Sequence, residues 1–117
     1  MTESKNRPMF ERVVDSLKGL RTGWRRERSV RAHVLSSLSG VAILAFWQPA
    51  MAWFVAFASL IVVGLAIELI NAAIEALLDH LHPNFHGAIG DAKDMSSAAG
   101  FVINVAATST FFGALFT

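Results

Sequence analysis

The charged residues of this chain are confined to a few regions, and their distribution constrains the fold more than any motif does. Nine of the ten Lys and Arg residues lie at or before Arg31. No Asp, Glu, Lys or Arg occurs from Ala32 to Ile67, and none occurs from Met95 to Thr117. Uncharged apolar stretches of about 18 or more residues are typical of transmembrane helices. The sequence therefore predicts an all-α integral membrane protein, and 117 residues allow one domain.

The composition excludes several other classes of protein. Hydrophobic residues make up 54% of the chain and charged residues only 16%, compared with about a quarter in soluble domains. The basic residues form a local cluster and the formal net charge is +1, so no nucleic-acid partner is expected. There is no cysteine, which excludes disulfides and thiolate metal sites.

The order of polar and apolar stretches predicts one surface helix followed by three membrane-spanning helices. Residues 1–8 are polar and are expected to be disordered. In 9–28 the apolar residues recur at helical spacing and most basic residues fall elsewhere, as in an amphipathic helix on an anionic membrane surface. Packing of this helix on the protein itself is a compatible alternative. The predicted spans are 32–48, 50–80 and 92–116.

The second span is too long for the hydrocarbon core. Its 31 residues, 50–80, give a helix of roughly 46 Å, whereas the core is about 30 Å thick. Its charged end is therefore expected to emerge into the interface. Because basic residues flanking a span stay in the cytoplasm, the N-terminus and the 81–92 loop are predicted to be cytoplasmic.

Four polar residues share one side of this second span. Glu68, Asn71, Glu75 and Asp79 fall at i, i+3, i+7 and i+11, so they occupy an arc of roughly 80°. Three carboxylates and an amide at the end of a membrane span are costly to keep. Ionisable residues in such places usually serve a function.

The residue types predict a site for a metal and a phosphate donor beside a lipid. Mg²⁺ prefers oxygen ligands and is often held by one or two carboxylates together with substrate phosphates, which assigns it to Glu75. Lys93 can neutralise phosphate at the start of the third span, with Asp94 beside it and Ser97 one turn further on. Glu68, the deepest carboxylate, is predicted to be partly desolvated and to act as a general base.

Other functions were weighed against this one. A zinc site is suggested by three histidines, His80, His82 and His86. However, Pro83 disfavours the necessary helical geometry, and no fourth ligand is evident. A small ion-conducting oligomer would use Glu68 as a buried titrating group. A purely structural membrane peptide would have no need of intramembrane acids.

Three motifs resemble the prokaryotic diacylglycerol kinase family. The sequence ExxNxAIExxxD begins at Glu68, and AKDMSSAA occupies 92–99. GLRxxWRxE, from Gly19 to Glu27, is similar to the N-terminal block of that family. The resemblance implies a homotrimer of three-span subunits in the bacterial inner membrane. It also implies Mg²⁺- and ATP-dependent phosphorylation of a lipid hydroxyl, at sites shared between neighbouring subunits.

The resemblance also implies roles for individual residues. The groups at the reacting atoms would be Glu68 as general base, with Asn71 and Ser97. The nucleotide would contact Glu27, Glu75, Asp79, His86, Lys93 and Asp94, and the metal would be held by Glu27 and Glu75. The lipid would contact Arg12, Trp24, Arg31 and Glu68.

The identity of the lipid stays open between two acceptors. Arg28, Arg31 and His33, in ERxxRxH, look more like the related undecaprenol kinases. In contrast, KDMSSAA from Lys93 looks more like the diacylglycerol enzymes. Diacylglycerol is the predicted substrate and undecaprenol is the alternative.

Overall fold

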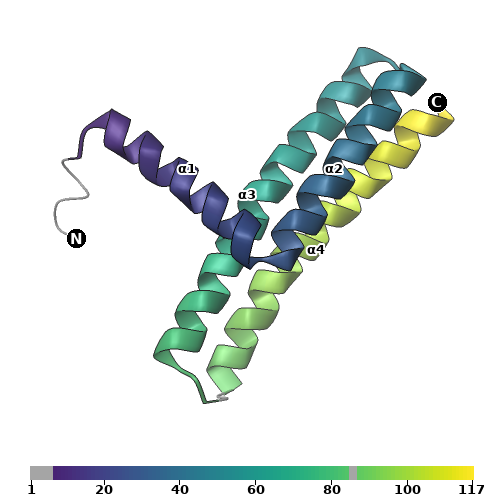
Figure 1. Cartoon of the computed structure of the whole chain (residues 1–117). Helices are drawn as coiled ribbons and strands as arrows, with labels where there is room; N and C mark the ends of the chain where they lie inside the picture. The colour runs from purple at the N-terminus through teal and green to yellow at the C-terminus, as the bar shows by residue number, and fades with distance from the viewer. Residues whose placement is uncertain (1–6, 85–86) are drawn as a thin grey trace.

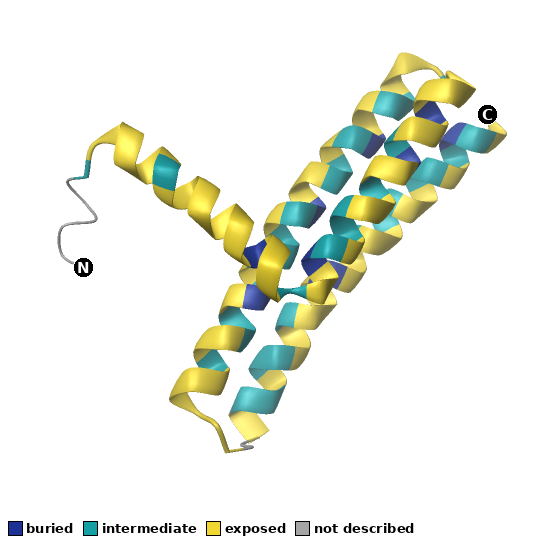
Figure 2. Ribbon diagram, in the orientation of Figure 1, coloured by how far each residue is buried: buried dark blue, intermediate teal, exposed yellow. Residues whose placement is uncertain are grey.

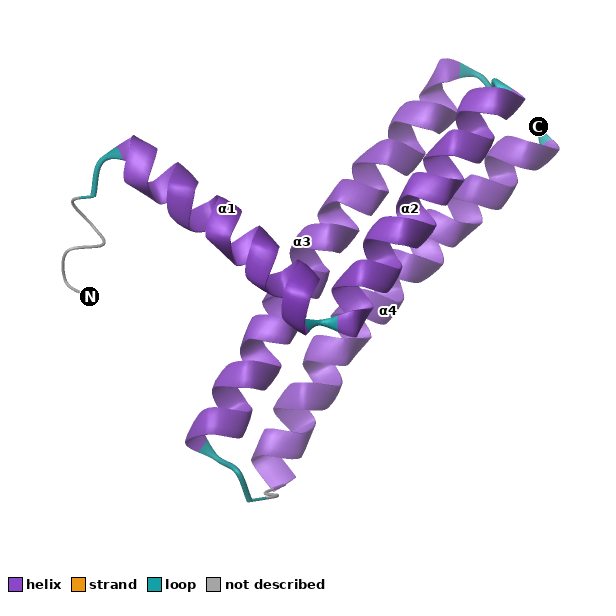
Figure 3. Cartoon of the chain, in the orientation of Figure 1, coloured by secondary structure: helices purple, strands orange, loops and turns teal. Residues whose placement is uncertain are grey.

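The computed structural model describes residues 7–84 and 87–117, and the regular structure in these ranges is entirely helical (Figure 3). Within them the chain forms four helices, α1 (Met9–Arg26), α2 (Arg28–Trp47), α3 (Met51–Leu81) and α4 (Gly87–Phe116). Helices α2, α3 and α4 lie side by side, whereas α1 runs across and away from them (Figure 1). The prediction of an all-α chain with three long apolar helices is confirmed, because α2, α3 and α4 are each long and apolar enough to cross a membrane.

The helices extend beyond the apolar stretches from which the spans were predicted. Helix α2 begins at Arg28, before the predicted span of 32–48, and α4 begins at Gly87, before the span of 92–116. Hydropathy detects only the apolar part of a helix, but backbone hydrogen bonds continue through polar first turns. The span predicted over 50–80 corresponds to α3, with Ala50 preceding its first helical residue.

The breaks between helices have local causes. Glu27 is extended (φ −110°, ψ 111°), and its N–H donates to the Gly23 carbonyl at 2.9 Å, which ends α1. At the far end of α2, Gln48 adopts the left-handed conformation with φ 57°, and its N–H donates to the Leu44 carbonyl at 2.8 Å. Pro49 follows, and proline cannot continue the hydrogen-bonding pattern of α2. Both breaks are therefore sharp.

The buried core is small and lies at the end of the bundle near the α2–α3 turn. It consists of Leu44, Phe57 and Ala114, one from each long helix. Nearby, a Cβ on Gly113 would come within 2.5 Å of the Trp53 ring, so only glycine lets these helices approach so closely there. Most of the remaining bundle surface is exposed (Figure 2). Large apolar side chains on it require lipid or another protein surface.

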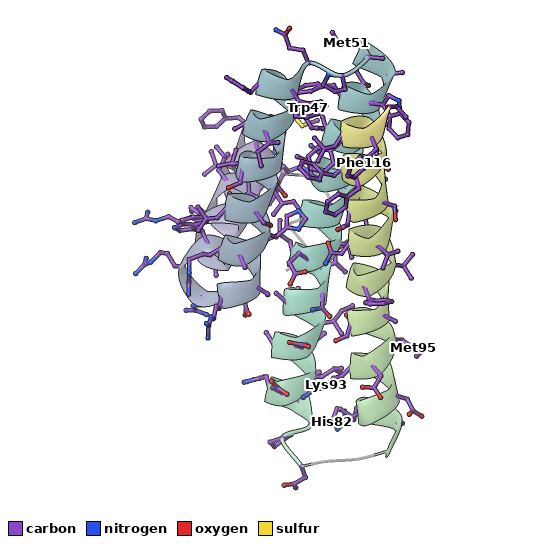
Figure 4. The ribbon with its side chains drawn as sticks, turned by 90° about the vertical axis from the view of Figure 1, so that its right-hand side faces the viewer. Trp47, Met51, His82, Lys93, Met95 and Phe116 are labelled. Atoms are coloured by element: carbon purple, nitrogen blue, oxygen red, sulfur yellow. The ribbon has the colours of Figure 1, made fainter. Side chains whose placement is uncertain are left out.

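Helices α3 and α4 form a hairpin that continues past the start of α2 (Figure 1). Figure 4 places His82 and Lys93 at this extended end and Trp47, Met51 and Phe116 at the other. The corner between α1 and α2 packs against the middle of α3, where a Cβ on Gly23 would lie 2.7 Å from Leu69 Cδ2. Helix α1 therefore leaves the bundle at the level where the polar part of α3 begins.

Candidate active site

The polar residues predicted on one side of the second span lie along α3 and meet α4. We call Glu68, Asn71, Glu75 and Asp79 the polar stripe. The first three are half-buried and Asp79 is exposed. Contacts between the stripe and α4 occur at three successive levels along the hairpin. They show that Asp79 meets Lys93 near the start of α4, as the sequence predicts, and that Asn71 and Glu68 lie beside Ser96 and Gly100 further along α4.

The outermost contact is an ion pair between Asp79 and the Lys93 ammonium. The side chains of Lys93 and Asp79 are 37% and 64% exposed, respectively. Ion pairs this open to water contribute little to stability, because the gain in Coulomb energy is offset by hydration and side-chain entropy. The Lys93 ammonium can therefore exchange Asp79 for another anion at low energetic cost.

The middle contact is a hydrogen bond between two half-buried side chains. The Ser96 hydroxyl donates to the Asn71 carbonyl oxygen, with 2.5 Å between Oγ and Oδ1. This bond fixes which end of the Asn71 amide is oriented toward α4. The amide NH₂ remains a donor for other groups at the site.

The innermost contact places the backbone of α4 beside Glu68. Gly100 is buried, and a Cβ added to it would lie 3.7 Å from Glu68 Oε2. Glu68 also borders a groove of about 810 Å³ between α2, α3 and α4. The deepest carboxylate of the stripe is thus adjacent to an open volume within the bundle.

Glu27 approaches α3 from the side of α1. It is half-buried in the extended link between α1 and α2. With Leu69, Ala72 and Ala76 it lines a second cavity, of about 640 Å³. Glu27 therefore lies at the level of the polar stripe, but it borders a different space from the one that Glu68 borders.

Two predicted nucleotide contacts, Asp94 and His86, and Ser97, which is predicted to lie near the reacting groups, are less constrained. Asp94 and Ser97 are exposed, and neither makes a side-chain hydrogen bond within residues 7–84 and 87–117. His86, predicted to contact the nucleotide, lies outside the described residues. The roles of all three stay predictions.

Comparison with known proteins identifies the family of this chain. A model of the prokaryotic diacylglycerol kinase family matches residues 14–115. The chain is 30% identical over 112 residues to the diacylglycerol kinase of Escherichia coli (strain K12), covering 92% of each chain. The chain belongs to the prokaryotic diacylglycerol kinase family. The diacylglycerol kinase of Shigella flexneri gives the same identity and coverage, and that of Haemophilus influenzae is 26% identical over 87 residues, 74% of each chain.

Membership of this family confirms the resemblance inferred from the motifs beginning at Glu68 and Ala92. All of the predicted site residues except Arg12 lie within the matched range. The family is one of membrane lipid kinases, and the three long apolar helices are consistent with a membrane protein.

The residues predicted to contact lipid are dispersed along α1 and α2. Arg12 is exposed on the outer half of α1, and Trp24 is 41% exposed near its end. The Arg31 guanidinium instead donates from Nη1 to the carbonyl oxygens of Trp24, at 2.8 Å, and Arg25, at 3.1 Å. These are free carbonyls at the end of α1, where a cation is favourable. In this structure Arg31 secures the corner between α1 and α2.

Sequence reasoning gave no specific partner to Ser96, Gly100 or His33. Ser96 precedes Ser97, the serine that shares a helix face with Lys93 and to which the sequence assigns a role. The ring of His33 lines the same groove as Glu68, from α2. The buried glycines Gly64 and Gly100 were the available signal, since small residues mark close helix contacts.

The bond between Ser96 and Asn71 gives a direct test of the hairpin. Ser96→Ala is expected to lower the free energy of unfolding by about 0.5–1.5 kcal/mol, the usual net value of one hydrogen bond. Unfolding would be followed by circular dichroism as dodecyl sulfate is titrated into mixed micelles. Ser97→Ala, at an exposed neighbouring position, is the matched control.

The same measurement on Asn71→Ala and on the double variant isolates the pair. The double variant is expected to lose less stability than the sum of the two single variants, because both remove the same bond. Strict additivity would show that Asn71 and Ser96 do not interact in the folded protein.

Proposed function

We propose that this chain is an ATP-dependent lipid kinase that transfers the γ-phosphoryl group of ATP to the hydroxyl of diacylglycerol, giving phosphatidate. The observation that carries this proposal is the contact of the polar stripe of α3 with Lys93 and Ser96 of α4. Membership of the diacylglycerol kinase family supports the same reaction class. A cation and several carboxylates at one end of a membrane bundle suit a triphosphate beside a lipid.

The arrangement of the helices supports a reaction at the membrane surface. Helix α1 leaves the bundle where its corner packs on Leu69, next to Glu68 (Figure 1). Its exposed apolar side chains, including Phe10, Leu17 and Trp24, suit the boundary between headgroups and acyl chains. With α1 on that boundary, the Glu68 carboxylate lies at the depth in the membrane at which the diacylglycerol hydroxyl is found. The continuing α3–α4 hairpin then reaches water, where ATP is dissolved.

In the proposed reaction Glu68 is the general base. Its carboxylate accepts the proton of the lipid hydroxyl as the hydroxyl oxygen forms a bond to the γ-phosphorus. The bond from the γ-phosphorus to the bridging oxygen breaks, and ADP leaves with that oxygen. The half-buried position of Glu68 beside the groove between α2, α3 and α4 suits proton transfer from an alcohol that arrives from lipid. Asn71, oriented by Ser96, is one turn away.

Lys93 is proposed to contact the ATP phosphates. Its ammonium pairs with Asp79, and a triphosphate would compete for it because a triphosphate carries more negative charge than one carboxylate. Asp79, released from Lys93, would then contact the rest of the nucleotide together with Asp94 and His86. Ser97 would lie near the reacting groups.

The carboxylates fit a magnesium ion that is shared with the nucleotide. In residues 7–84 and 87–117 there is no cluster of three or more His, Asp and Glu side chains able to hold a metal alone. Mg²⁺ is commonly held by one or two carboxylates, with phosphates and water as the other ligands. The family resemblance assigns this role to Glu27 and Glu75, of which Glu27 borders the cavity beside Leu69, Ala72 and Ala76. When bound, the ion would neutralise charge on the ATP phosphates.

We further propose that the active unit is a homotrimer in the bacterial inner membrane, with the N-terminus and the site on the cytoplasmic face. The cluster of basic residues before the first span favours this orientation. Support for association comes from the small core and from exposed side chains such as Phe46, which is 91% exposed. A neighbouring subunit would complete each site. Arg12 and Trp24 of α1 would cover the route of the lipid.

Undecaprenol is a second candidate acceptor, because Arg28, Arg31 and His33 resemble the undecaprenol kinases. The test is transfer of radiolabel from [γ-³²P]ATP to each lipid in mixed micelles, with identification of the product. Phosphatidate is expected to form much faster than undecaprenyl phosphate. Chelation of Mg²⁺ should abolish the transfer, and added Mg²⁺ should restore it. Preference for the polyprenol would replace the proposed substrate, and ATP hydrolysis without a labelled lipid would reject a lipid kinase.

Glu68→Gln and Glu75→Gln are each expected to lower kcat more than about a hundredfold. General-base catalysis typically contributes about 10²–10⁴, so loss of the Glu68 carboxylate should reach that scale. Loss of Glu75 removes a proposed metal ligand of the nucleotide. Glu11→Gln is the matched control, because Glu11 is exposed on α1 and pairs with Arg7. Near-normal turnover in either site variant, in folded protein, would contradict its assigned role.

A further inference from the structure

His33 is a polar side chain of α2 that the proposed reaction does not use. It is half-buried, and its Nε2 lies 3.0 Å from the Ile61 carbonyl oxygen of α3. A carbonyl oxygen can only accept, so Nε2 carries the hydrogen in this contact. A polar group inside a membrane-spanning segment is stable only when it is paired, and the backbone carbonyl supplies the partner. His33 thus joins α2 to α3 by a side-chain hydrogen bond.

The close fit of this ring depends on Gly64. A Cβ on Gly64 would lie 2.7 Å from His33 Cε1 and 3.3 Å from Nε2. The same Cβ would lie 3.7 Å from Ile103 Cγ1 of α4, so three helices converge at this point. The ring is therefore seated on the backbone of α3. Any side chain at position 64 would displace it.

The same ring forms part of the wall of the groove that reaches Glu68. His33 and Glu68 both line this groove of about 810 Å³, which is within the usual size range of ligand sites. Glu68 follows Gly64 by one helical turn, about 6 Å along α3. Ser36 and Ser37 line the groove beside His33, and Phe57 and Phe111 line its apolar part.

We propose that the lipid alcohol reaches Glu68 through this groove and that His33 is a positioning residue for it. The proposal rests on the proposed lipid kinase function. The Ser36 hydroxyl donates to the His33 carbonyl, but the Ser37 hydroxyl also lines the groove. A hydroxyl donor near His33 and an apolar wall beyond suit a glycerolipid, whose ester carbonyls accept hydrogen bonds and whose acyl chains do not. By holding α2 against α3 at Gly64, His33 sets the distance between the two walls that the glycerol part must enter.

The test is steady-state kinetics of the full chain in mixed micelles, varying diacylglycerol at saturating ATP and then ATP at saturating diacylglycerol. His33→Ala is expected to raise the KM for diacylglycerol about fivefold, because α2 is no longer held against α3 and binding the lipid must then order the groove without the free energy of that one neutral hydrogen bond; the KM for ATP should stay unchanged. His33→Gln retains an N–H donor and should restore most of the lipid affinity. His82→Ala, an exposed histidine in the loop after α3, is the matched control.

Gly64→Ala tests the positioning role of His33 by a second route, without changing the histidine itself. In the wild-type background it should raise the KM for diacylglycerol as His33→Ala does, because the new Cβ displaces the ring. In the His33→Ala background the same change should have little further effect, since the clashing ring is gone.

Several outcomes would overturn the proposal. An unchanged lipid KM in His33→Ala would do so, and so would a Gly64→Ala effect that is equal in both backgrounds. If His33→Ala changed the oligomeric state in size-exclusion chromatography without changing the lipid KM, the groove would be a contact between subunits. A wild-type protein that phosphorylates no lipid would reject the proposed function itself, a result distinct from all of these.

Discussion

The structure depends on how α3 carries carboxylates at the end of a membrane span. An isolated charge in the hydrocarbon core costs about 2.5–3.5 kcal/mol even on insertion scales, so such groups must be paired or brought to water. Helix α4 supplies polar partners to two members of the stripe. Ser96 bonds Asn71, and at the end of the hairpin that reaches water Lys93 pairs with Asp79. Beside Glu68, the deepest carboxylate, α4 presents the buried Gly100.

Packing and chemistry are separated along the bundle. Leu44, Phe57 and Ala114 form the core at the end near the α2–α3 turn. The polar stripe lies toward the other end, where α2 no longer covers the hairpin and apolar burial is sparse (Figure 2). Fewer buried contacts leave this region the more easily rearranged part of the fold, as a site that must admit both a nucleotide and a lipid requires.

Features that depend on hydropathy or on the helical period could be predicted from the sequence, whereas contacts that depend on the rotation of a helix or on its backbone could not. The three apolar helices and the shared side of Glu68, Asn71, Glu75 and Asp79 follow from hydropathy and from the 3.6-residue period, and the approach of this stripe to Lys93 follows from the hairpin. The rotation of α4 could not be predicted, because α4 is apolar around much of its circumference. Ser96 therefore meets Asn71, although sequence reasoning emphasised Ser97. The contact of His33 with the Ile61 carbonyl could not be predicted from the pattern of side chains, because the acceptor is a backbone atom. The ring fits there because Gly64 has no side chain.

The central claim is that the polar stripe and the start of α4 bind nucleotide together on the cytoplasmic face. Since the chain has no cysteine, one cysteine can be added at Asp91, an exposed position two residues before Lys93, and a second variant can carry it at Ala50 in the opposite turn. Labelling with a membrane-impermeant maleimide would compare spheroplasts with inside-out vesicles, with and without ATP and Mg²⁺. With the site on the cytoplasmic face, the cysteine at 91 should react only in inside-out vesicles and be protected by ATP with Mg²⁺, whereas the one at 50 should react only in spheroplasts. Reaction of the cysteine at 91 from outside, or labelling indifferent to nucleotide, would contradict the central claim.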